Sequence, residues 1–422
     1  MLGRVLAAPN SSSMILHHET PARHTGLERL NEFAPLMGAQ YAHRRNIDPG
    51  EDARPNVSQL SPFLRHRLIS EEEAATAAII VNGGEQATKY IQEICWRTYF
   101  KGWLEHHPAV WSDYILDRDT QFQTLEKDKG LRADYEAAIE GRAGIEGFDH
   151  WAKELAETGY LHNHARMSFA SIWLFTLKLP WALGADFFLR HLLDGDPASN
   201  TLSWRWVAGL HTSGKTYLAK KEAIETCSDG RFSPDNLAQS AHQVPGSENP
   251  QPQQLPVSDG MPEERFALLL TEDDLSVETW LDEHLPVEAI AGLESAGGRC
   301  TGDVSDKAMS FTRGALQDGL SRASNHFGAA AENLSDTADK RRALRDWAAQ
   351  LNTKHIVVPY LPAGWTREAI APLLTDLQTD GFHIHQMRRD WDERFWPHAK
   401  KGFFKLRKQI PSVLMHWKLR KV

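Results

Sequence analysis

Three short stretches in the first half of this 422-residue chain gather side chains that could bind a flat, charged ligand. In the first, Glu93, Trp96 and Arg97 stand three and four residues apart, which places them on one face of a helix. A guanidinium can clamp a phosphate, an indole can stack on a ring and a carboxylate can hydrogen-bond a ring edge. An ordinary ion pair over a core tryptophan has the same spacing, so the pattern alone leaves both interpretations open.

The second stretch has the sequence TGYLHNHARM, in which His162 and Arg166, and Asn163 and Met167, are one helical turn apart. His162 and His164 invite a metal interpretation. Residues two apart on a helix point in different directions, however, and no carboxylate completes a ligand set. We therefore expect no metal site here.

The third stretch is LLDGDPASNTLSWRW. Asp196 followed by Pro197 is typical of a capped helix start, and Asn200 and Trp204 then share a face of that helix. A ligand site and a capped helix with core tryptophans both fit this pattern.

A fourth stretch, GLHTSGKT at 209–216, matches the phosphate-binding loop of nucleoside triphosphatases. That motif needs a strand before the loop, whereas the residues before Gly209 are predicted to end a helix that starts near Pro197. A nucleoside triphosphatase is therefore kept as a minor alternative.

These stretches lie in a part of the chain that is predicted to be mainly helical. Residues 1–25 look irregular, and apolar residues recur at helical spacing from Gly26 to about Leu218. Ser70 with Glu73 forms a capping-box pattern. We expect a helical domain over 26–227.

The composition changes after residue 227. Residues 228–262 are rich in Pro, Gln, Ser and Asn, which is typical of a linker or a long surface loop. The apolar runs RFALLL, KHIVVPYL and FHIHQMRRD then alternate with helical patterns, which predicts a parallel, Rossmann-like sheet. We expect a smaller α/β domain over 263–422 with a basic C-terminal tail.

Charge and cysteine content narrow the function classes. The net charge of −9 disfavours a non-specific DNA-binding protein, yet residues 388–422 hold 11 Lys and Arg against 3 Asp and Glu. This tail suits either a polyanion or solvent. Three cysteines without metal-like spacing suit the cytoplasm, and neither a membrane span nor a signal peptide is expected.

In their order and spacing, the three helical stretches closely resemble the FAD-binding domain of the photolyase/cryptochrome family, from about Tyr41 to Tyr217. The resemblance also covers a flavin-phosphate loop, NVSQLSPFL, in which Asn56 and Val57 replace the usual hydroxyls. It implies FAD as the cofactor. The cofactor-binding residues that it implies are Tyr41, Asn56, Val57, Ser58, Gln59, Leu60, Ser61, Arg97, Asn163, Arg166, Asp194, Asp196 and Asn200.

The resemblance also implies a lesion-binding set. Glu93 corresponds to the residue that hydrogen-bonds a pyrimidine dimer, Trp96 and Trp206 to the aromatic walls of the lesion pocket, and Asn163 and Met167 to positions that touch the lesion. The set implies light-driven repair of cyclobutane pyrimidine dimers in UV-damaged DNA by a deoxyribodipyrimidine photo-lyase.

Trp204 and Trp181 correspond to the proximal and middle members of the family's electron-transfer chain. The surface tryptophan falls near Asp128 and is missing, so either Tyr135, Tyr160 or another tryptophan replaces it or electrons leave by a different route.

The missing tryptophan, the acidic net charge and His164, which replaces a frequent arginine, favour the main alternative. That alternative is a cryptochrome-like blue-light photoreceptor without repair activity.

The order of the domains departs from the family, whose members usually begin with an α/β antenna domain. Here the α/β part follows, and its segment RFWPHAKKGFFKLRK is similar to the family's antenna-domain ending. We expect a swapped domain order and allow for a second, unidentified antenna chromophore.

Overall fold

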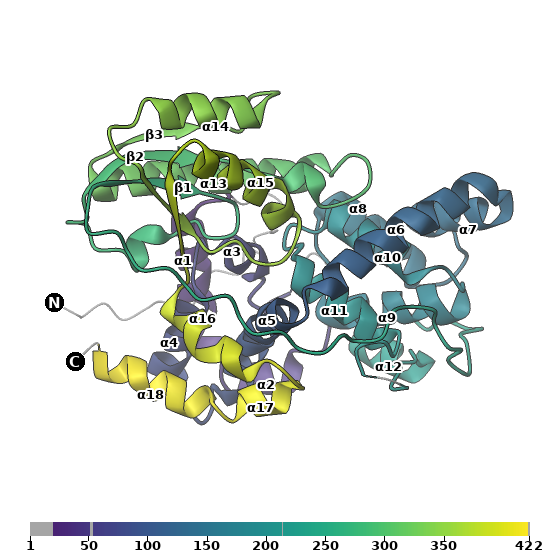
Figure 1. Cartoon of the computed structure of the whole chain (residues 1–422). Coiled ribbons are helices and arrows are strands. Elements are labelled where there is room, and N and C mark those ends of the chain that lie inside the picture. Colours follow the sequence, from purple (N-terminus) through teal and green to yellow (C-terminus); the bar gives the residue numbers. More distant parts are fainter. Residues whose placement is uncertain (1–19, 51–53, 213, 421–422) are drawn as a thin grey trace.

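The computed structural model describes residues 20–50, 54–212 and 214–420 and is helical up to residue 227 (Figure 1). Short 3-10 segments at Ala34–Leu36, Val277–Thr279, Ala296–Gly298 and Trp396–His398 and a π-helical segment at Ile172–Thr176 accompany the main elements. The helices of this part are α1 Arg23–Phe33, α2 Ala39–Arg44, α3 Ser61–Arg65, α4 Glu71–Asn82, α5 Thr88–His106, α6 Ala109–Lys127, α7 Lys129–Ile139, α8 Phe148–Thr158, α9 Asn163–Ser171, α10 Trp181–His191, α11 Pro197–Val207 and α12 Lys221–Cys227.

Local sequence accounts for two of the helix starts that matter for the site. Ser70 and Glu73 form the expected capping box at the start of α4, with both reciprocal hydrogen bonds present. The Asp196 carboxylate accepts from the backbone N–H of Ser199 at 2.8 Å and caps α11, with Pro197 in the first turn. The predicted capping box and the predicted cap of α11 are both confirmed.

The second half contains a five-stranded parallel sheet in the order β3-β2-β1-β4-β5. The strands are β1 Phe266–Leu270, β2 Val287–Gly292, β3 Ala330–Asn333, β4 His355–Pro359 and β5 His383–Met387. The accompanying helices are α13 Asp306–Phe327, α14 Lys340–Ala349, α15 Trp365–Thr379, α16 Asp390–Phe395, α17 Phe403–Arg407 and α18 Ile410–Arg420.

The central strand β1 is buried on both faces, as parallel strands between two helical layers are. Leu268 faces a core that continues through α13 into the helical domain, whereas Leu269 faces a separate core with α14 and α15. One face of the sheet therefore shares its core with the helical half, and the two halves are joined by apolar packing.

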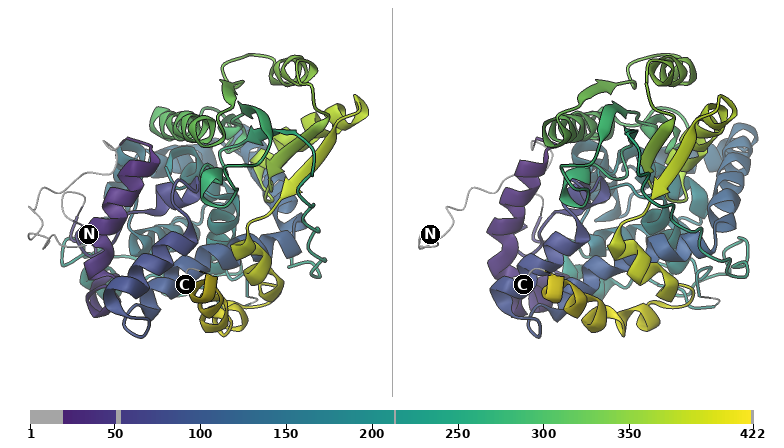
Figure 2. Two further views of the ribbon diagram at one scale, coloured as in Figure 1. Left: turned by 90° about the vertical axis from the view of Figure 1, so that its left-hand side faces the viewer. Right: turned by 60° about the vertical axis from the view of Figure 1, so that its left-hand side comes forward.

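After β5 the chain leaves the sheet and returns to the helical half, where α16, α17 and α18 lie along its lower edge (Figures 1 and 2). The segment between α12 and β1 forms neither helix nor strand and is pinned at several points. Arg205 donates to the backbone oxygen of Ser247 at 2.8 Å, and His106 lies 2.8 Å from that of Gln253.

The structure corrects the sequence-based prediction in several places. Helix α1 begins at Arg23, inside the segment predicted to be irregular, and residues 1–19 of that segment lie outside the described residues. Strand β2 was missed because it is rich in small residues: a Cβ on Gly292 would lie 2.7 Å from Leu320. Strand β3 was missed because it is mostly exposed and lacks an apolar pattern.

The phosphate-binding-loop alternative is wrong as well. The stretch that begins at Gly209 follows α11, and the first strand of the described chain starts only at Phe266. Without a strand before the loop, its backbone is not presented as in nucleoside triphosphatases.

A buried cluster of charges joins the two halves of the molecule. Arg65 Nη1 lies 2.5 Å from Asp273 Oδ1, and Arg67 Nη2 lies 2.7 Å from Asp392 Oδ2. Asp274, which follows Asp273, pairs with Arg389 at 2.6 Å. All of these side chains are buried, so each charge depends on its partner for the solvation that water no longer provides.

Replacing Arg67 with Ala should lower the free energy of unfolding by about 3–5 kcal/mol, because Asp392 would then stay buried without its arginine and Glu71 would keep only its pairing with Arg97. Arg345→Ala is the matched control, because it breaks an exposed ion pair with Asp380 and should lower the free energy of unfolding far less than Arg67→Ala does. Urea unfolding of both variants measures the difference. Equal losses would contradict the importance of the buried cluster.

Candidate functional site

The turn between α10 and α11, Asp194-Gly195-Asp196, carries the two carboxylates that the sequence singles out. Asp196 Oδ2 lies 2.9 Å from Arg97 Nη1 and 3.5 Å from Lys101 Nζ, both on α5. Burial alone would raise the pKa of Asp196, but Lys101, Arg97 and Arg65 together hold it well below its usual range. Asp196 is therefore ionised and bridges α5 to α11.

Asp194 has a different environment. Its Oδ2 accepts from Arg166 Nη2 at 2.9 Å, and Arg166 also donates to the backbone oxygen of Leu161. The other oxygen of Asp194 is buried and accepts no hydrogen bond from any described residue. A buried acceptor without a donor is costly, so this oxygen is suited to a donor on a bound ligand.

Two arginines bind the backbone of this turn and of the residues just before it. The sequence-based prediction did not include them. Arg65 Nε donates to the backbone oxygen of Gly195 at 2.7 Å, and Arg299 of the α/β half donates to that of Leu192. A Cβ on Gly195 would collide with Arg299, so the close approach requires glycine. Burial, and then Arg65, lower the pKa of Arg299 to about 10.

Arg97 was expected to bind phosphate, and it lies where several charges meet. Besides Asp196 it pairs with Glu71 at 3.3 Å and donates to the backbone oxygen of Arg65. Burial alone would raise the pKa of Glu71, but Arg67 and Arg97 lower it to about 2. Arg97 is thus a fixed cation between two carboxylates, with part of its side chain still accessible.

The loop predicted to bind phosphate is held by its own side chains. The Asn56 amide donates to the backbone oxygens of Arg44 at 2.7 Å and Ile47 at 2.5 Å. Gln59 has a φ of 51°, in the left-handed region, and Leu60 is buried before α3 begins at Ser61. Asn56 therefore shapes the loop, and Val57 has no polar side-chain atom to offer a phosphate.

Tyr41 and Glu93 lie close together at one side of the site. Tyr41 is buried edge-on against Tyr90, with 5.0 Å between ring centroids, and burial followed by Glu93 raises the pKa of Tyr41. Glu93 pairs with Arg45 at 3.1 Å and with Lys89 at 3.3 Å. Glu93 is thus a partly exposed carboxylate between two cations.

The two predicted aromatic walls have different surroundings. Trp96 stacks face to face on Phe403 of α17, with 3.8 Å between centroids and 13° between planes. Trp206 is exposed and stacks on Tyr217 at 5.7 Å. Sequence reasoning did not identify Phe403, because only the fold brings it to α5.

Asn163 and Met167 lie one turn apart on α9. Asn163 is exposed, and its Nδ2 lies 3.8 Å from the sulfur of Met167. Asn200 of α11 is buried, and its Nδ2 donates to the backbone oxygen of Ala185 at 2.9 Å.

Aromatic rings extend from Trp204 in a direction that the sequence did not reveal. Trp204 lies 6.2 Å from Trp173 in the π-helical segment, and Trp173 lies 6.0 Å from Tyr135, centroid to centroid. Trp181 instead lies 5.6 Å from Tyr114 and donates to Asp117. Asp128, where the surface tryptophan was expected, caps α7.

No group of histidine, cysteine and carboxylate side chains suited to a metal ion occurs within the part of the chain that the structure describes. Nor does any described helix have the length and apolar character of a membrane span.

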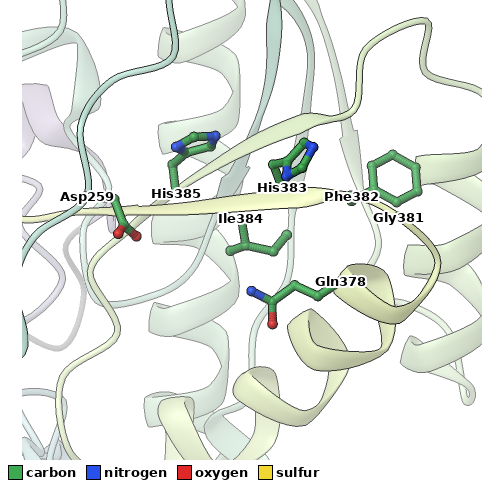
Figure 3. Close-up of a pocket in the computed structure, with 7 residues that line it drawn as sticks. All are labelled: Asp259, Gln378, Gly381, Phe382, His383, Ile384 and His385. Carbon is green, nitrogen blue, oxygen red and sulfur yellow. The ribbon is translucent and has the colours of Figure 1, made fainter.

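A hollow of about 460 Å³ lies on the outer side of β5, lined by Asp259, Gln378 and residues 381–385 (Figure 3). It contains none of the predicted site residues.

The His162 ring caps α9, and its protonation is coupled to the stability of the folded protein. Its Nδ1 accepts from the backbone N–H of His164 at 3.2 Å, so Nε2 carries the proton and donates to the backbone oxygen of Arg45 at 3.0 Å. Burial lowers the pKa of His162 to about 4. Because the pKa of His162 in the folded protein lies below the usual 6.5, the neutral ring contributes to the stability of the fold. This contribution is fully present above pH 6.5 and is lost as the pH falls toward 4.

We therefore expect His162→Asn to flatten the loss of stability between pH 6.5 and pH 4 by up to about 1.4 kcal/mol per pH unit. Urea unfolding across this range measures the slope, and His284→Asn, at an exposed histidine, is the control. An unchanged slope in His162→Asn would contradict the assignment.

Comparison with known proteins finds similarity over part of the chain. Residues 90–234 match the family model described as the FAD binding domain of DNA photolyase. The chain is 34% identical over 201 residues to a deoxyribodipyrimidine photo-lyase of Thermus thermophilus. This alignment covers 47% of the chain and 45% of the Thermus protein. The chain is 30% identical over 209 residues to the enzyme of the same name from Neurospora crassa, covering 48% of this chain and 33% of that protein.

The chain spans less than half the length of these curated relatives. Among solved structures, a class III photolyase from Agrobacterium tumefaciens matches 53% of this chain and 46% of its own, with 23% identity and a TM-score of 0.42. A Synechocystis cryptochrome matches the same shares, with 21% identity and a TM-score of 0.41. By the family model and the curated relatives, residues 90–234 are similar to the FAD-binding domain of DNA photolyases.

Proposed function

We propose that the protein uses FAD and light to repair cyclobutane pyrimidine dimers in DNA. The observation that carries the proposal is the Asp194–Asp196 turn. Each of its carboxylates is bridged to an arginine, and Asp194 keeps a buried oxygen free for a donor on the cofactor. The turn lies inside the segment that matches the FAD-binding family, and the curated relatives of that segment are named deoxyribodipyrimidine photo-lyases.

The proposed site residues offer polar groups that a bound FAD would need. Asp194 offers an acceptor to the flavin ring edge, and Arg97 with the loop at Ser58–Ser61 offers positive charge and backbone N–H groups to the phosphates. Tyr41 and Asn200 complete the proposed cofactor set. Asn56 and Val57 contribute backbone and loop shape rather than side-chain contacts.

FAD held by these residues would supply, once reduced and excited by light, the electron that splits the cyclobutane ring. The lesion must leave the base stack to come close enough, and damaged pairs cost less to extrude. Glu93 would hydrogen-bond the extruded dimer, since its carboxylate is only partly buried between Arg45 and Lys89. Trp206 offers an exposed aromatic surface, and Asn163 and Met167 lie on the accessible side of α9.

The aromatic contacts support a route through Trp173 for electrons that reduce the cofactor. Trp204 is the proposed first donor, and Trp173 followed by Tyr135 forms a continuous ring contact away from it. Trp181 belongs to a second group with Tyr114. Tyr135 would thereby be the third member of the route, although it is buried rather than at the surface.

The α/β half is proposed as an antenna-like domain in swapped order. Open α/β sheets bind ligands where the strand order reverses, here at the carboxyl ends of β1 and β4. Arg65 and Trp365 fill that position, with the Trp365 Nε1–H donating to Glu272 at 3.1 Å. A second chromophore would therefore need a different place on this domain.

One observation favours the alternative function, a blue-light photoreceptor without repair activity. Phe403 covers one face of Trp96, the ring that is proposed to pack a dimer. A lesion pocket closed in this way would leave the light chemistry of the cofactor intact while excluding the DNA substrate.

Light-dependent loss of dimers from UV-irradiated DNA tests the proposal. The protein should remove dimers under blue light, and Glu93→Gln should lower the rate roughly tenfold or more through loss of a charge-assisted hydrogen bond. Glu85→Gln, an exposed carboxylate just before α5, is the control and should keep full activity. A flavin-loaded protein that removes no dimers would contradict repair and favour the photoreceptor.

Photoreduction of the bound flavin tests the electron route separately. We expect Trp204→Phe to abolish light-driven reduction in the presence of an external reductant, and Trp173→Phe to slow it more than Trp181→Phe does. The flavin absorption bands report the rate. Normal photoreduction in Trp173→Phe, with loss in Trp181→Phe, would contradict the route through Trp173.

A further inference from the structure

The C-terminal end of the chain carries a concentration of positive charge that the proposed site does not use. From Trp396 to Val422 the sequence contains no Asp or Glu. Around α17 the described cations are all exposed: Lys400, Lys401, Lys405, Arg407 and Lys408. We refer to these five residues together with Phe404 as the α17 surface.

The cations of the α17 surface form no ion pair with a carboxylate of the described chain, unlike the other exposed basic row. On α14, Arg341 pairs with Asp376 and Arg345 pairs with Asp380. The charge of α14 is thus compensated within the molecule. The charge of the α17 surface remains available to an external anion.

Packing fixes the direction in which this surface faces. Phe403, Leu406 and Ile410 are buried, and Phe403 stacks on Trp96 of α5. Because the apolar side of the segment is held against α5, its basic side faces solvent. The α17 surface therefore borders α5, the helix that carries Glu93 and Trp96. That these two residues form a lesion site rests on the proposed function.

An exposed aromatic ring lies among these charges. Phe404 is 68% exposed, and the Arg407 guanidinium lies 5.1 Å from its ring centroid. Aromatic rings flanked by cations are typical of surfaces that bind nucleic acids, since bases stack on the rings and phosphates pair with the cations.

We propose that the α17 surface binds the sugar–phosphate backbone of DNA beside the lesion site, with Phe404 contacting an unstacked base. The carboxylate-free sequence, the unpaired cations and the exposed ring carry this inference together. An anionic membrane is the weaker candidate, because the apolar side of the segment is already buried against α5. DNA contact from this segment adds a second domain to the DNA-binding face.

The salt dependence of binding to an undamaged, labelled DNA duplex tests the cations. Each phosphate contact contributes about 0.9 to the slope of log affinity against log salt, so Lys405→Ala/Lys408→Ala should make the slope shallower by about 1.8. Lys127→Ala/Lys129→Ala removes two exposed charges from α6 and α7 and is the matched control. Equal slopes for the two double variants would overturn the proposal.

The aromatic contact is tested on the same chain with single-stranded DNA. Phe404→Ala should weaken binding roughly tenfold without changing the salt slope, since stacking releases no counterions. Leu116→Ala, at a residue that is 67% exposed on α6, is the control and should have no effect. Unchanged binding by Phe404→Ala would remove the base contact from the proposal.

Further results distinguish DNA binding by the α17 surface from membrane binding and from the proposed repair function. Membrane binding would be shown if the protein sedimented with phosphatidylserine vesicles through Lys405 and Lys408 while its DNA binding did not depend on them. That result would overturn the proposal. If the protein repairs dimers but the Lys405→Ala/Lys408→Ala variant keeps the native salt slope, DNA binding by the α17 surface is contradicted and the proposed function stands. If DNA binding depends on the α17 surface but no dimer is repaired, the α17 proposal is supported and only the proposed function is contradicted.

Discussion

The buried pairing of Arg65 and Arg67 with Asp273, Asp274 and Asp392 is the interaction on which the rest of the site depends. Charges removed from water are stable only if their partners are in place, so this cluster fixes the α/β half against α3 and α4. Arg65 also donates to Gly195, which links the same cluster to the turn that carries Asp194 and Asp196. The docking of the α/β half and the position of this turn therefore depend on the same arginine.

Apolar packing and a further arginine strengthen the connection between the two halves. One face of the parallel sheet shares a core with the helical half, and Arg299 from the α/β half reaches the backbone at Leu192. The last helices then return to α5, where Phe403 covers a face of Trp96. Side chains from the second half of the chain thus contact both the Asp194–Asp196 turn and the proposed lesion pocket.

The sequence predicted what depends on short spacing. The capping box at Ser70, the cap at Asp196 and the strands that begin near Phe266, His355 and His383 are local patterns, and all are present. The contacts of Arg65 with Asp273 and of Trp96 with Phe403 join residues far apart in sequence, and no spacing encodes them. The contact of Trp204 with Trp173 was hidden by a π-helical turn, which shifts side chains from the expected helical positions.

The central claim, that the Asp194–Asp196 turn and Arg97 hold FAD, is tested most directly by the visible absorption spectrum of the purified protein after incubation with FAD and removal of unbound cofactor. The account predicts flavin bands in the native protein, and their loss in Asp194→Ala while the cooperative unfolding of that variant is retained. A folded native protein that shows no flavin bands would contradict it.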